Sequence, residues 1–280
     1  MRAAVLGSPI EHSLSPVLHN AGYRAAGLDD WSYSSARVEE AGLAAFVSGL
    51  DADWRGLSLT MPLKRACLDV AHDVTALAAG AGVGNTLVRL ANGDWLADNT
   101  DIGGLVDALG PSWSADWGRV AVLGSGATAR SAVLAVSLLG ADRITLYARN
   151  GHAAARLAAW AASAAPAVAV TTAALDDWQA GDEPAVLSTL PAGAADGGGL
   201  PPREGLLFDV VYAGWPTPLA QAALNAGMTV VSGFELLVHQ AARQFELFTQ
   251  VAAPVEAMRA AGQARLGQPT EEARGGGGGT

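Results

Sequence analysis

The sequence has 280 residues, half of them apolar, and a mean hydropathy of +0.24, so it can fill one large or two medium hydrophobic cores. Its formal net charge is −10 and no run of basic residues interrupts the acidic balance, which excludes nucleic acid and anionic membrane surfaces as expected partners. Cys67 is the only cysteine, so an internal disulfide and a multi-cysteine metal site are excluded, and a reduced, cytoplasmic setting is expected.

The first ninety residues alternate short apolar runs with helical stretches. Strands are expected at 3–7, 31–38, 56–60 and 85–90, and helices at 16–28, 39–50 and 74–82. The alternation predicts parallel strands joined by crossover helices, because a parallel pair needs a long connection. Ser15 and Pro16 fit the N-cap and the first position of a helix. His12 and His19 are not at the spacing of metal ligands, and no metal is expected.

A second alternating region begins after residue 118. Residues 119–148 are expected to form a strand, a glycine-rich loop, a helix and a strand, which together make a βαβ unit. Further strands are expected at 185–191, 205–212 and 228–233, so this half predicts a doubly wound sheet of about six strands. An amphipathic helix is expected over 233–249. The glycine-rich segments 196–205 and 266–280 are expected to be a flexible loop and a disordered tail, because ordering glycine is entropically costly.

Residues 157–175 carry no charge over nineteen positions, which is long enough for a membrane span. The stretch is mostly alanine with serine, threonine and a central Pro166, so it lacks the strong apolar character of a span. A helix that ends before Pro166 and a short strand at 167–170 are expected instead.

A glycine-rich loop follows the apolar strand that begins the second region. Gly124 permits a tight turn, Gly126 lets backbone approach a pyrophosphate, and the small Ala129 lets the helix pack against the strand. Phosphates would then face the amides of Ser125, Ala127 and Thr128 at the start of the helix. The motif predicts a dinucleotide site, and the alternative is a glycine-rich turn without a ligand.

The end of the next strand indicates which dinucleotide is bound. An NAD site usually places Asp or Glu there, against the ribose 2′-hydroxyl, but this strand ends in Arg149 and Asn150. Asp142 precedes the strand and lies at its opposite end. The Arg149 guanidinium could bind a 2′-phosphate, which favours NADP, and the alternative is an ordinary surface arginine.

Two further residues could carry chemistry, although each alone has an ordinary explanation. Lys64 follows a strand that breaks at Pro62, where a lysine is usually solvated. Asp101 lies at the start of a helical stretch, where an aspartate is usually a cap.

Seven segments follow one another along the chain: GSPIEHSLSPVLHN (7–20), LSLTMPLK (57–64), GNT (84–86), DNTDIGG (98–104), GSGATA (124–129), DVVYAGWPTPL (209–219) and GFELLVHQA (233–241). In this order they resemble the motif set of the shikimate dehydrogenase family, over residues 7 to about 262. The complete ordered set is highly specific, whereas the glycine loop alone is not.

The resemblance implies a fold of two α/β domains. A parallel-rich catalytic domain, residues 1–103 completed by 234–265, would bind substrate, and a Rossmann-like doubly wound domain, 104–233, would bind NADP. A C-terminal helix would return to the first domain. The active site would then lie in the cleft between the domains.

The resemblance also implies residue roles. Lys64 and Asp101 would be the catalytic pair. Shikimate would be bound through its carboxylate and ring hydroxyls by Ser13, Ser15, Thr60, Asn85, Asp101, Tyr212 and Gln240. NADP would be bound by Gly124, Ser125, Gly126, Ala127, Thr128, Arg149, Asn150, Val210 and Gly233.

One departure from the family pattern concerns the cofactor. The strand end is usually Asn-Arg-Thr with a second basic residue soon after, whereas here it is Ala148-Arg149-Asn150 with Ala153 in the second basic position. Arg156 lies further along the helix.

The predicted function is therefore the reversible, NADPH-dependent reduction of 3-dehydroshikimate to shikimate, in chorismate and aromatic amino acid biosynthesis, by a cytoplasmic monomer or homodimer. The first alternative is a quinate/shikimate dehydrogenase that uses NAD. The second is a catalytically idle dinucleotide-binding regulator of the same fold, and the presence of both Lys64 and Asp101 argues against it.

Overall fold

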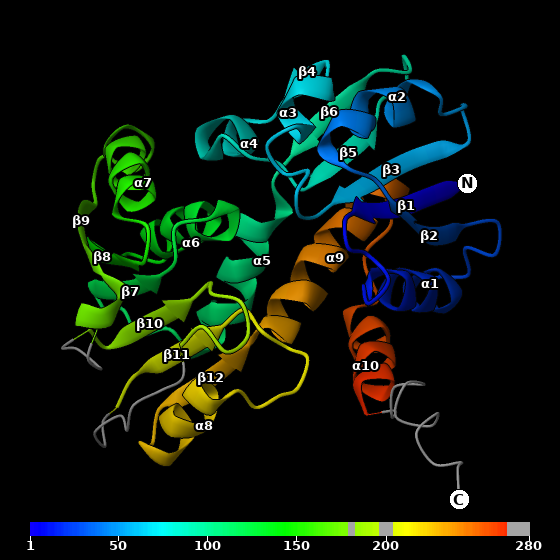
Figure 1. The fold of residues 1–280 in the computed structure, drawn as a ribbon. Helices are drawn as coiled ribbons and strands as arrows, with labels where there is room; N and C mark the ends of the chain where they lie inside the picture. The colour runs from blue at the N-terminus through cyan, green and yellow to red at the C-terminus, as the bar shows by residue number, and fades with distance from the viewer. Residues whose placement is uncertain (179–182, 196–203, 268–280) are drawn as a thin grey trace, which may run out of the picture.

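A computed structural model describes residues 1–178, 183–195 and 204–267. Within these residues the chain forms two six-stranded sheets, each at the centre of one lobe (Figure 1). The predicted flexible loop at 196–205 and the predicted tail lie mostly outside the described residues. The tail prediction is wrong at its first residue, since Leu266 still belongs to the helix α10 (Val255–Leu266).

The sheet of the first lobe has the order β2-β1-β3-β5-β6-β4. Its strands are β1 (Arg2–Gly7), β2 (Ser32–Arg37), β3 (Trp54–Leu59), β4 (Asp73–Val74), β5 (Thr86–Arg89) and β6 (Trp95–Asp98). Helices α1 (Ser15–Ala25), α2 (Leu43–Ser48), α3 (Cys67–Val70) and α4 (Ala76–Ala81) connect them, with a short 3-10 turn, η1 (Glu40–Gly42), before α2.

The prediction of parallel strands in this lobe is right for β1, β2 and β3 and wrong for β5. β5 runs antiparallel to both β3 and β6, and it forms a hairpin with β6. The hairpin turns at Gly93, whose φ of +92° strains any other residue. Strands β4, of two residues, and β6, of four, were not predicted from the sequence.

The sheet of the second lobe has the order β12-β11-β10-β7-β8-β9, and all of its pairs are parallel. This is a doubly wound order, and the sequence predicted a doubly wound sheet of about six strands. Its strands are β7 (Arg119–Leu123), β8 (Arg143–Ala148), β9 (Ala169–Ala174), β10 (Ala185–Ser188), β11 (Leu206–Asp209) and β12 (Thr229–Ser232). The helices are α6 (Ala127–Leu138), α7 (Gly151–Ala164) and α8 (Pro218–Asn225), with a 3-10 turn, η3 (Leu175–Asp177), after β9.

Two helices join the lobes. α5 (Thr100–Leu109) leaves the first lobe and ends in a 3-10 turn, η2 (Gly110–Ser112), and α9 (Gly233–Thr249) returns from β12, as predicted. The helices cross closely: a Cβ added to Gly104 would lie 2.9 Å from the backbone nitrogen of Gln240. The predicted domain boundary after residue 103 falls inside α5.

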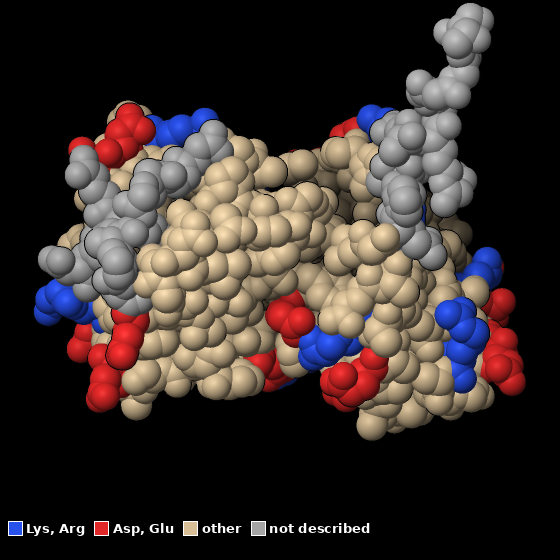
Figure 2. Space-filling view, turned by 90° about the horizontal axis from the view of Figure 1, so that it is seen from below, with Lys and Arg blue, Asp and Glu red and all other residues tan. Residues whose placement is uncertain are grey.

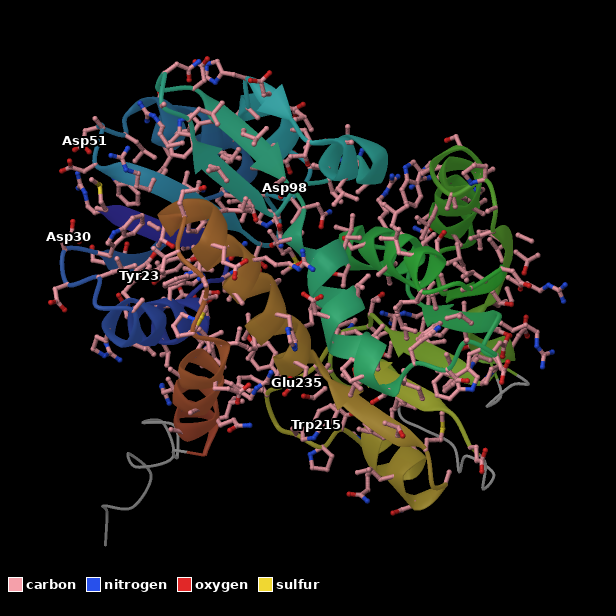
Figure 3. All side chains as sticks on the ribbon, turned by 180° about the vertical axis from the view of Figure 1, so that it is seen from behind. Tyr23, Asp30, Asp51, Asp98, Trp215 and Glu235 are labelled. Carbon is pink, nitrogen blue, oxygen red and sulfur yellow. The ribbon has the colours of Figure 1, made fainter. Side chains whose placement is uncertain are left out.

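The far end of α9 completes the core of the first lobe. Figure 3 shows Glu235 near the start of α9, and Tyr23 on α1 beside its other end. The rings of Tyr23 and Phe245 are 5.3 Å apart, and Phe245 is fully buried. Seen from below, in Figure 2, the lobes meet along a seam where acidic and basic side chains gather.

No helix in the described part of the chain is long and apolar enough to cross a membrane. Residues 157–175 instead contain the end of α7, the irregular segment around Pro166, and β9, as their composition predicts.

Candidate active site

The strand directions of the first lobe bring the site together. β1, β3 and β6 run the same way, so the segments that follow them lie at one edge of the sheet. The antiparallel β5 presents its beginning at this same edge. Thr60 to Lys64 therefore lie near Asp101, after β6, and near Asn85, before β5.

Lys64 and Asp101 form the central ion pair. The Lys64 Nζ donates to Asp101 Oδ2 over 2.5 Å, and the two side chains are 18% and 7% exposed. A pair so largely withdrawn from water interacts more strongly than a surface pair. The carboxylate thus holds the lysine side chain at the cleft.

Asn85 fixes the other oxygen of this carboxylate. Its Nδ2 donates to Asp101 Oδ1 over 2.8 Å, and its Oδ1 accepts from the Thr100 backbone amide over 2.8 Å. Because a backbone amide can only donate, the Asn85 side chain cannot be flipped without loss of this bond. Both oxygens of Asp101 are therefore bound.

A cavity of about 290 Å³ opens over the ion pair. It brings together every residue predicted to be catalytic or to bind substrate, and it also includes Val210 and Gly233, which were predicted to lie near the cofactor. The predicted substrate and catalytic residues that line it are Ser13, Ser15, Thr60, Lys64, Asn85, Asp101, Tyr212 and Gln240. Burial raises the pKa of Tyr212, so its phenol stays neutral.

Three polar residues that line this cavity were not predicted: His12, which was considered only as a metal ligand, and two residues joined to each other, Ser58 and Gln244. The Ser58 hydroxyl donates to Gln244 Oε1 over 2.7 Å, and Gln244 Nε2 donates to the Thr86 hydroxyl over 2.9 Å. Periodicity could have found both: Ser58 lies two residues before Thr60 on one strand face, and Gln244 lies one helical turn after Gln240.

The prediction that Ser15 caps α1 is wrong. Ser15 is the first residue of the helix, and Leu14 occupies the N-cap position with helical backbone angles and no side-chain cap. The Ser15 amide instead donates to the Ser13 hydroxyl over 3.3 Å. Both serines line the substrate cavity at the start of α1.

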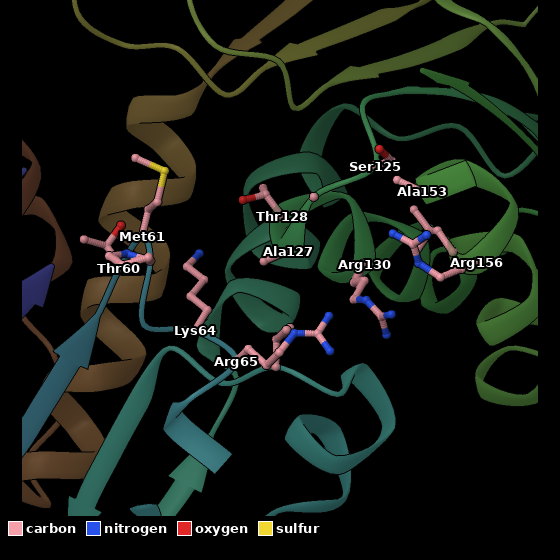
Figure 4. A pocket seen from close by; sticks show the side chains of 14 residues that line it. Thr60, Met61, Lys64, Arg65, Ser125, Ala127, Thr128, Arg130, Ala153 and Arg156 are labelled. Atoms are coloured by element: carbon pink, nitrogen blue, oxygen red, sulfur yellow. The ribbon is translucent and has the colours of Figure 1, made fainter. Parts of the chain in front are cut away.

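A second cavity, of about 410 Å³, lies between the lobes beside the glycine loop (Figure 4). Its walls include Ser125, Gly126, Ala127 and Thr128 at the N-terminus of α6. A Cβ added to Gly126 would meet nothing within 4 Å, so the space beside this backbone is open.

Gly124 explains why the loop can turn so sharply. Its φ is +115°, and an added Cβ would lie 2.4 Å from the Thr189 hydroxyl. An open backbone, a helix N-terminus and several cationic side chains on the walls fit the phosphates of a dinucleotide.

The predicted 2′-phosphate residues do not line this cavity. Arg149 is exposed after β8, and the side chain of Asn150 caps α7 by accepting from the Ala153 amide over 3.0 Å. Arg156, noted in the sequence as a more distant cation, does line the cavity. Arg65 and Arg130 line it too, and the sequence analysis did not identify them.

Family models match both ends of the chain. A model described as the shikimate dehydrogenase substrate binding domain matches residues 5–87, and one described as the shikimate 5′-dehydrogenase C-terminal domain matches residues 233–261.

Curated relatives match nearly the whole length. A protein of a Synechococcus strain, named shikimate dehydrogenase (NADP(+)), is 35% identical over 94% of this chain and 95% of its own length. A protein of the same name from Caulobacter vibrioides is 35% identical over 89% of this chain and 90% of its own length.

Solved structures share the fold. Shikimate dehydrogenase of Mycobacterium tuberculosis is 45% identical with a TM-score of 0.84, covering 94% of this chain and 99% of that one. A quinate dehydrogenase of Corynebacterium glutamicum in complex with NAD has the same TM-score at 25% identity, and the match covers 94% of this chain and 99% of that one. The backbone alone therefore does not distinguish the two activities.

Two lobes of this topology, with a lysine–aspartate pair facing a dinucleotide loop, define an oxidoreductase of the dinucleotide-dependent class. Within that class, the chain belongs to the shikimate dehydrogenase family. The comparisons confirm the predicted family, fold class, enzyme class and NADP cofactor.

Proposed function

We propose that this protein catalyses the reversible, NADPH-dependent reduction of 3-dehydroshikimate to shikimate, the step that leads toward chorismate and the aromatic amino acids. One observation carries the proposal: Lys64 and Thr60 line both cavities. A group that transfers a proton during hydride transfer must lie where substrate and cofactor meet, and the position of Lys64 on both cavities supports this role.

NADPH, when bound, supplies a hydride to the ring ketone carbon. The C–O double bond becomes single, and the Lys64 ammonium gives its proton to the developing alkoxide, leaving a neutral amine that regains a proton from water. Before that transfer, the positive charge of Lys64 stabilises the developing oxyanion. Asp101, held by Asn85, keeps the lysine in place, and in the reverse direction the neutral amine accepts the hydroxyl proton.

The remaining assignments follow the positions of the side chains around the substrate cavity. Ser13 and Ser15, with Tyr212 nearby, bind the carboxylate of the substrate. Thr60, Asn85, Asp101 and Gln240 bind its ring hydroxyls. Each of these side chains lines the cavity, which supports the assignment.

Gly124 to Thr128 bind the pyrophosphate of NADP, and Val210 and Gly233 lie against the nicotinamide, since both line the substrate cavity. Arg149, which is exposed after β8 beside Asn150, binds the 2′-phosphate. The division into a catalytic domain, 1–103 with 234–265, and an NADP domain, 104–233, belongs to this proposal. So do the cytoplasmic setting and the monomeric or homodimeric state.

A substrate and cofactor panel tests this proposal. Shikimate with NADP should give the highest kcat/KM, and the other pairs to assay are quinate with NADP and each acid with NAD. A preference for quinate or for NAD would establish the quinate alternative, and no turnover with any pair would establish the idle regulator.

Lys64 variants test the assigned chemistry. Lys64→Ala should lower kcat about 100-fold or more with a modest change in KM, because the ammonium acts mainly on charge that develops in the transition state. Lys64→Arg keeps the cation but cannot donate its proton readily, so it should stay far below wild type. Near wild-type turnover in Lys64→Ala would remove this residue from the mechanism.

A further inference from the structure

The walls of the cofactor cavity carry an unusual charge. Among the fourteen residues that line it, none is acidic, and four are cationic: Lys64, Arg65, Arg130 and Arg156. Lys64 is paired with Asp101, whereas the three arginines form no ion pair with any residue in the described part of the chain. Three unpaired guanidinium groups around one cavity, in a protein of net charge −10, indicate a site for an anion.

The arginines come from both sides of the cleft. Arg65 follows Lys64 in the turn after β3 and belongs to the first lobe, while Arg130 on α6 and Arg156 on α7 belong to the second. Figure 4 shows Arg65 and Arg130 near each other, with the guanidinium of Arg156 close by. Burial, and then the charge of Arg65, lower the pKa of Arg130, so the two like charges act on each other across the cleft.

Arg130 is held in place against this repulsion. Its Nη1 donates to the Ala81 carbonyl over 3.1 Å, and its guanidinium lies 4.7 Å from the ring centre of Trp160. Trp160 itself donates to the Gly80 carbonyl over 2.8 Å. Both contacts reach the end of α4 in the first lobe, so Arg130 already lies where the lobes touch.

We propose that Arg65 and Arg130 bind one phosphate group of the dinucleotide between them, so that the cofactor draws the two lobes together. This inference rests on the proposed function, because it takes the bound anion to be the cofactor NADP. A phosphate can accept from both guanidinium groups at once, and it replaces their mutual repulsion with two charge-assisted contacts. The substrate lobe thereby contributes directly to cofactor binding, through the residue next to the catalytic lysine.

Calorimetric titration of purified variants tests the proposal without reliance on turnover. Arg65→Ala should weaken NADP⁺ binding about ten- to a hundredfold, the range for a charge-assisted contact, and should leave the affinity for shikimate alone unchanged. Arg265→Ala is the matched control, because it removes one exposed cation from α10, far from the cleft.

Three titrants identify which phosphate is bound. If Arg65 and Arg130 bind the 2′-phosphate, Arg65→Ala should weaken NADP⁺ and adenosine 2′,5′-bisphosphate and leave NAD⁺ unchanged. If they bind the pyrophosphate, NADP⁺ and NAD⁺ should weaken equally. If Arg65→Ala binds all three titrants as tightly as wild type does, the phosphate proposal is overturned, but the proposed function stands as long as wild type binds NADP⁺. If wild type does not bind NADP⁺, both are overturned.

Small-angle X-ray scattering tests the approach of the lobes. Saturating NADP⁺ should reduce the radius of gyration of wild type more than that of Arg65→Ala. An equal reduction in the two proteins would show that Arg65 does not couple the cofactor to closure.

Discussion

The orientation of the Asp101 carboxylate is determined by its neighbours, because each of its two oxygens accepts a hydrogen bond. Lys64 binds one carboxylate oxygen and Asn85 the other. The Thr86 hydroxyl donates to Asn85 Oδ1 over 2.8 Å and accepts from Gln244. The hydrogen bonds thus all point toward the ion pair: Gln244 donates to Thr86, Thr86 to Asn85, and Asn85 to Asp101. Thr86 connects the buried Gln244 to the site.

Thr86→Val removes both bonds at that link while it preserves the shape of the side chain. Of these two bonds, only the one to Asn85 helps to position Asp101. We expect kcat to fall about three- to tenfold, the scale of one lost hydrogen bond, because Asn85 then holds Asp101 less firmly. Thr86→Ser keeps the hydroxyl and should restore kcat. Equal kcat for Thr86→Val and wild type would show that Asn85 is fixed by Thr100 alone.

At the scale of elements, α1 carries a neutral histidine into the core of the first lobe. His19 is fully buried and stacks on Tyr33 at 4.0 Å between ring centres. Burial lowers the pKa of His19 to about 3, although the nearby Gln244 side chain opposes the shift. The folded protein therefore resists protonation of this ring, whereas the unfolded chain accepts the proton near pH 6.5.

This difference predicts acid sensitivity. Between pH 6.5 and about 3 the unfolded state binds more protons at His19 than the folded state, so stability falls as the pH falls. The contribution is fully present above pH 6.5. The free energy of unfolding, measured with urea at pH 7.5 and at pH 5, should decrease less for His19→Phe than for wild type. Equal decreases in the two proteins would mean that other groups cause the acid dependence.

The crossing of α5 and α9 yields a second prediction at this scale. Gly104→Ala would place a methyl group 2.9 Å from the backbone of Gln240, which cannot move aside as a flexible side chain can. Overpacking of this kind costs about 1–3 kcal/mol, and the displaced α9 should also raise the KM for shikimate. Gly110→Ala adds a methyl group in open space at the end of α5 and should change neither the urea midpoint nor the KM. A Gly104→Ala variant as stable as wild type would show that the helices can separate freely.

For the whole molecule, the ordered motifs predicted both lobes and the substrate site. A set of motifs indicates which residues belong to one site even when they lie far apart in the sequence. The local sequence pattern predicted the β7–α6–β8 unit correctly but predicted the wrong direction for β5. A four-residue apolar run has the same pattern in a parallel and in an antiparallel pair. Arg65 and Arg130 had no local signal at all: only the packing of one lobe against the other brings them to one cavity.

The choice between NADP and NAD is predicted to depend on Arg149, after β8 of the second lobe. Arg149 lies exposed after β8. If it binds the 2′-phosphate, Arg149→Ala should weaken NADP by about tenfold or more and leave NAD almost unchanged. The ratio of kcat/KM for NADP to that for NAD measures this effect in wild type and variant. If the variant keeps the full preference, Arg149 is an ordinary surface residue and the discrimination lies elsewhere.

Lys64 is also the only lysine in the sequence. The other primary amine is that of Met1, which donates to the Asp30 carbonyl over 2.6 Å. Within this sequence, amine-directed dyes, cross-linkers and biosensor surfaces can therefore react with only one side chain, that of Lys64 in the candidate active site. Shikimate and NADP should shield Lys64 during such labelling, and attachment through an engineered exposed cysteine should preserve activity that amine coupling removes.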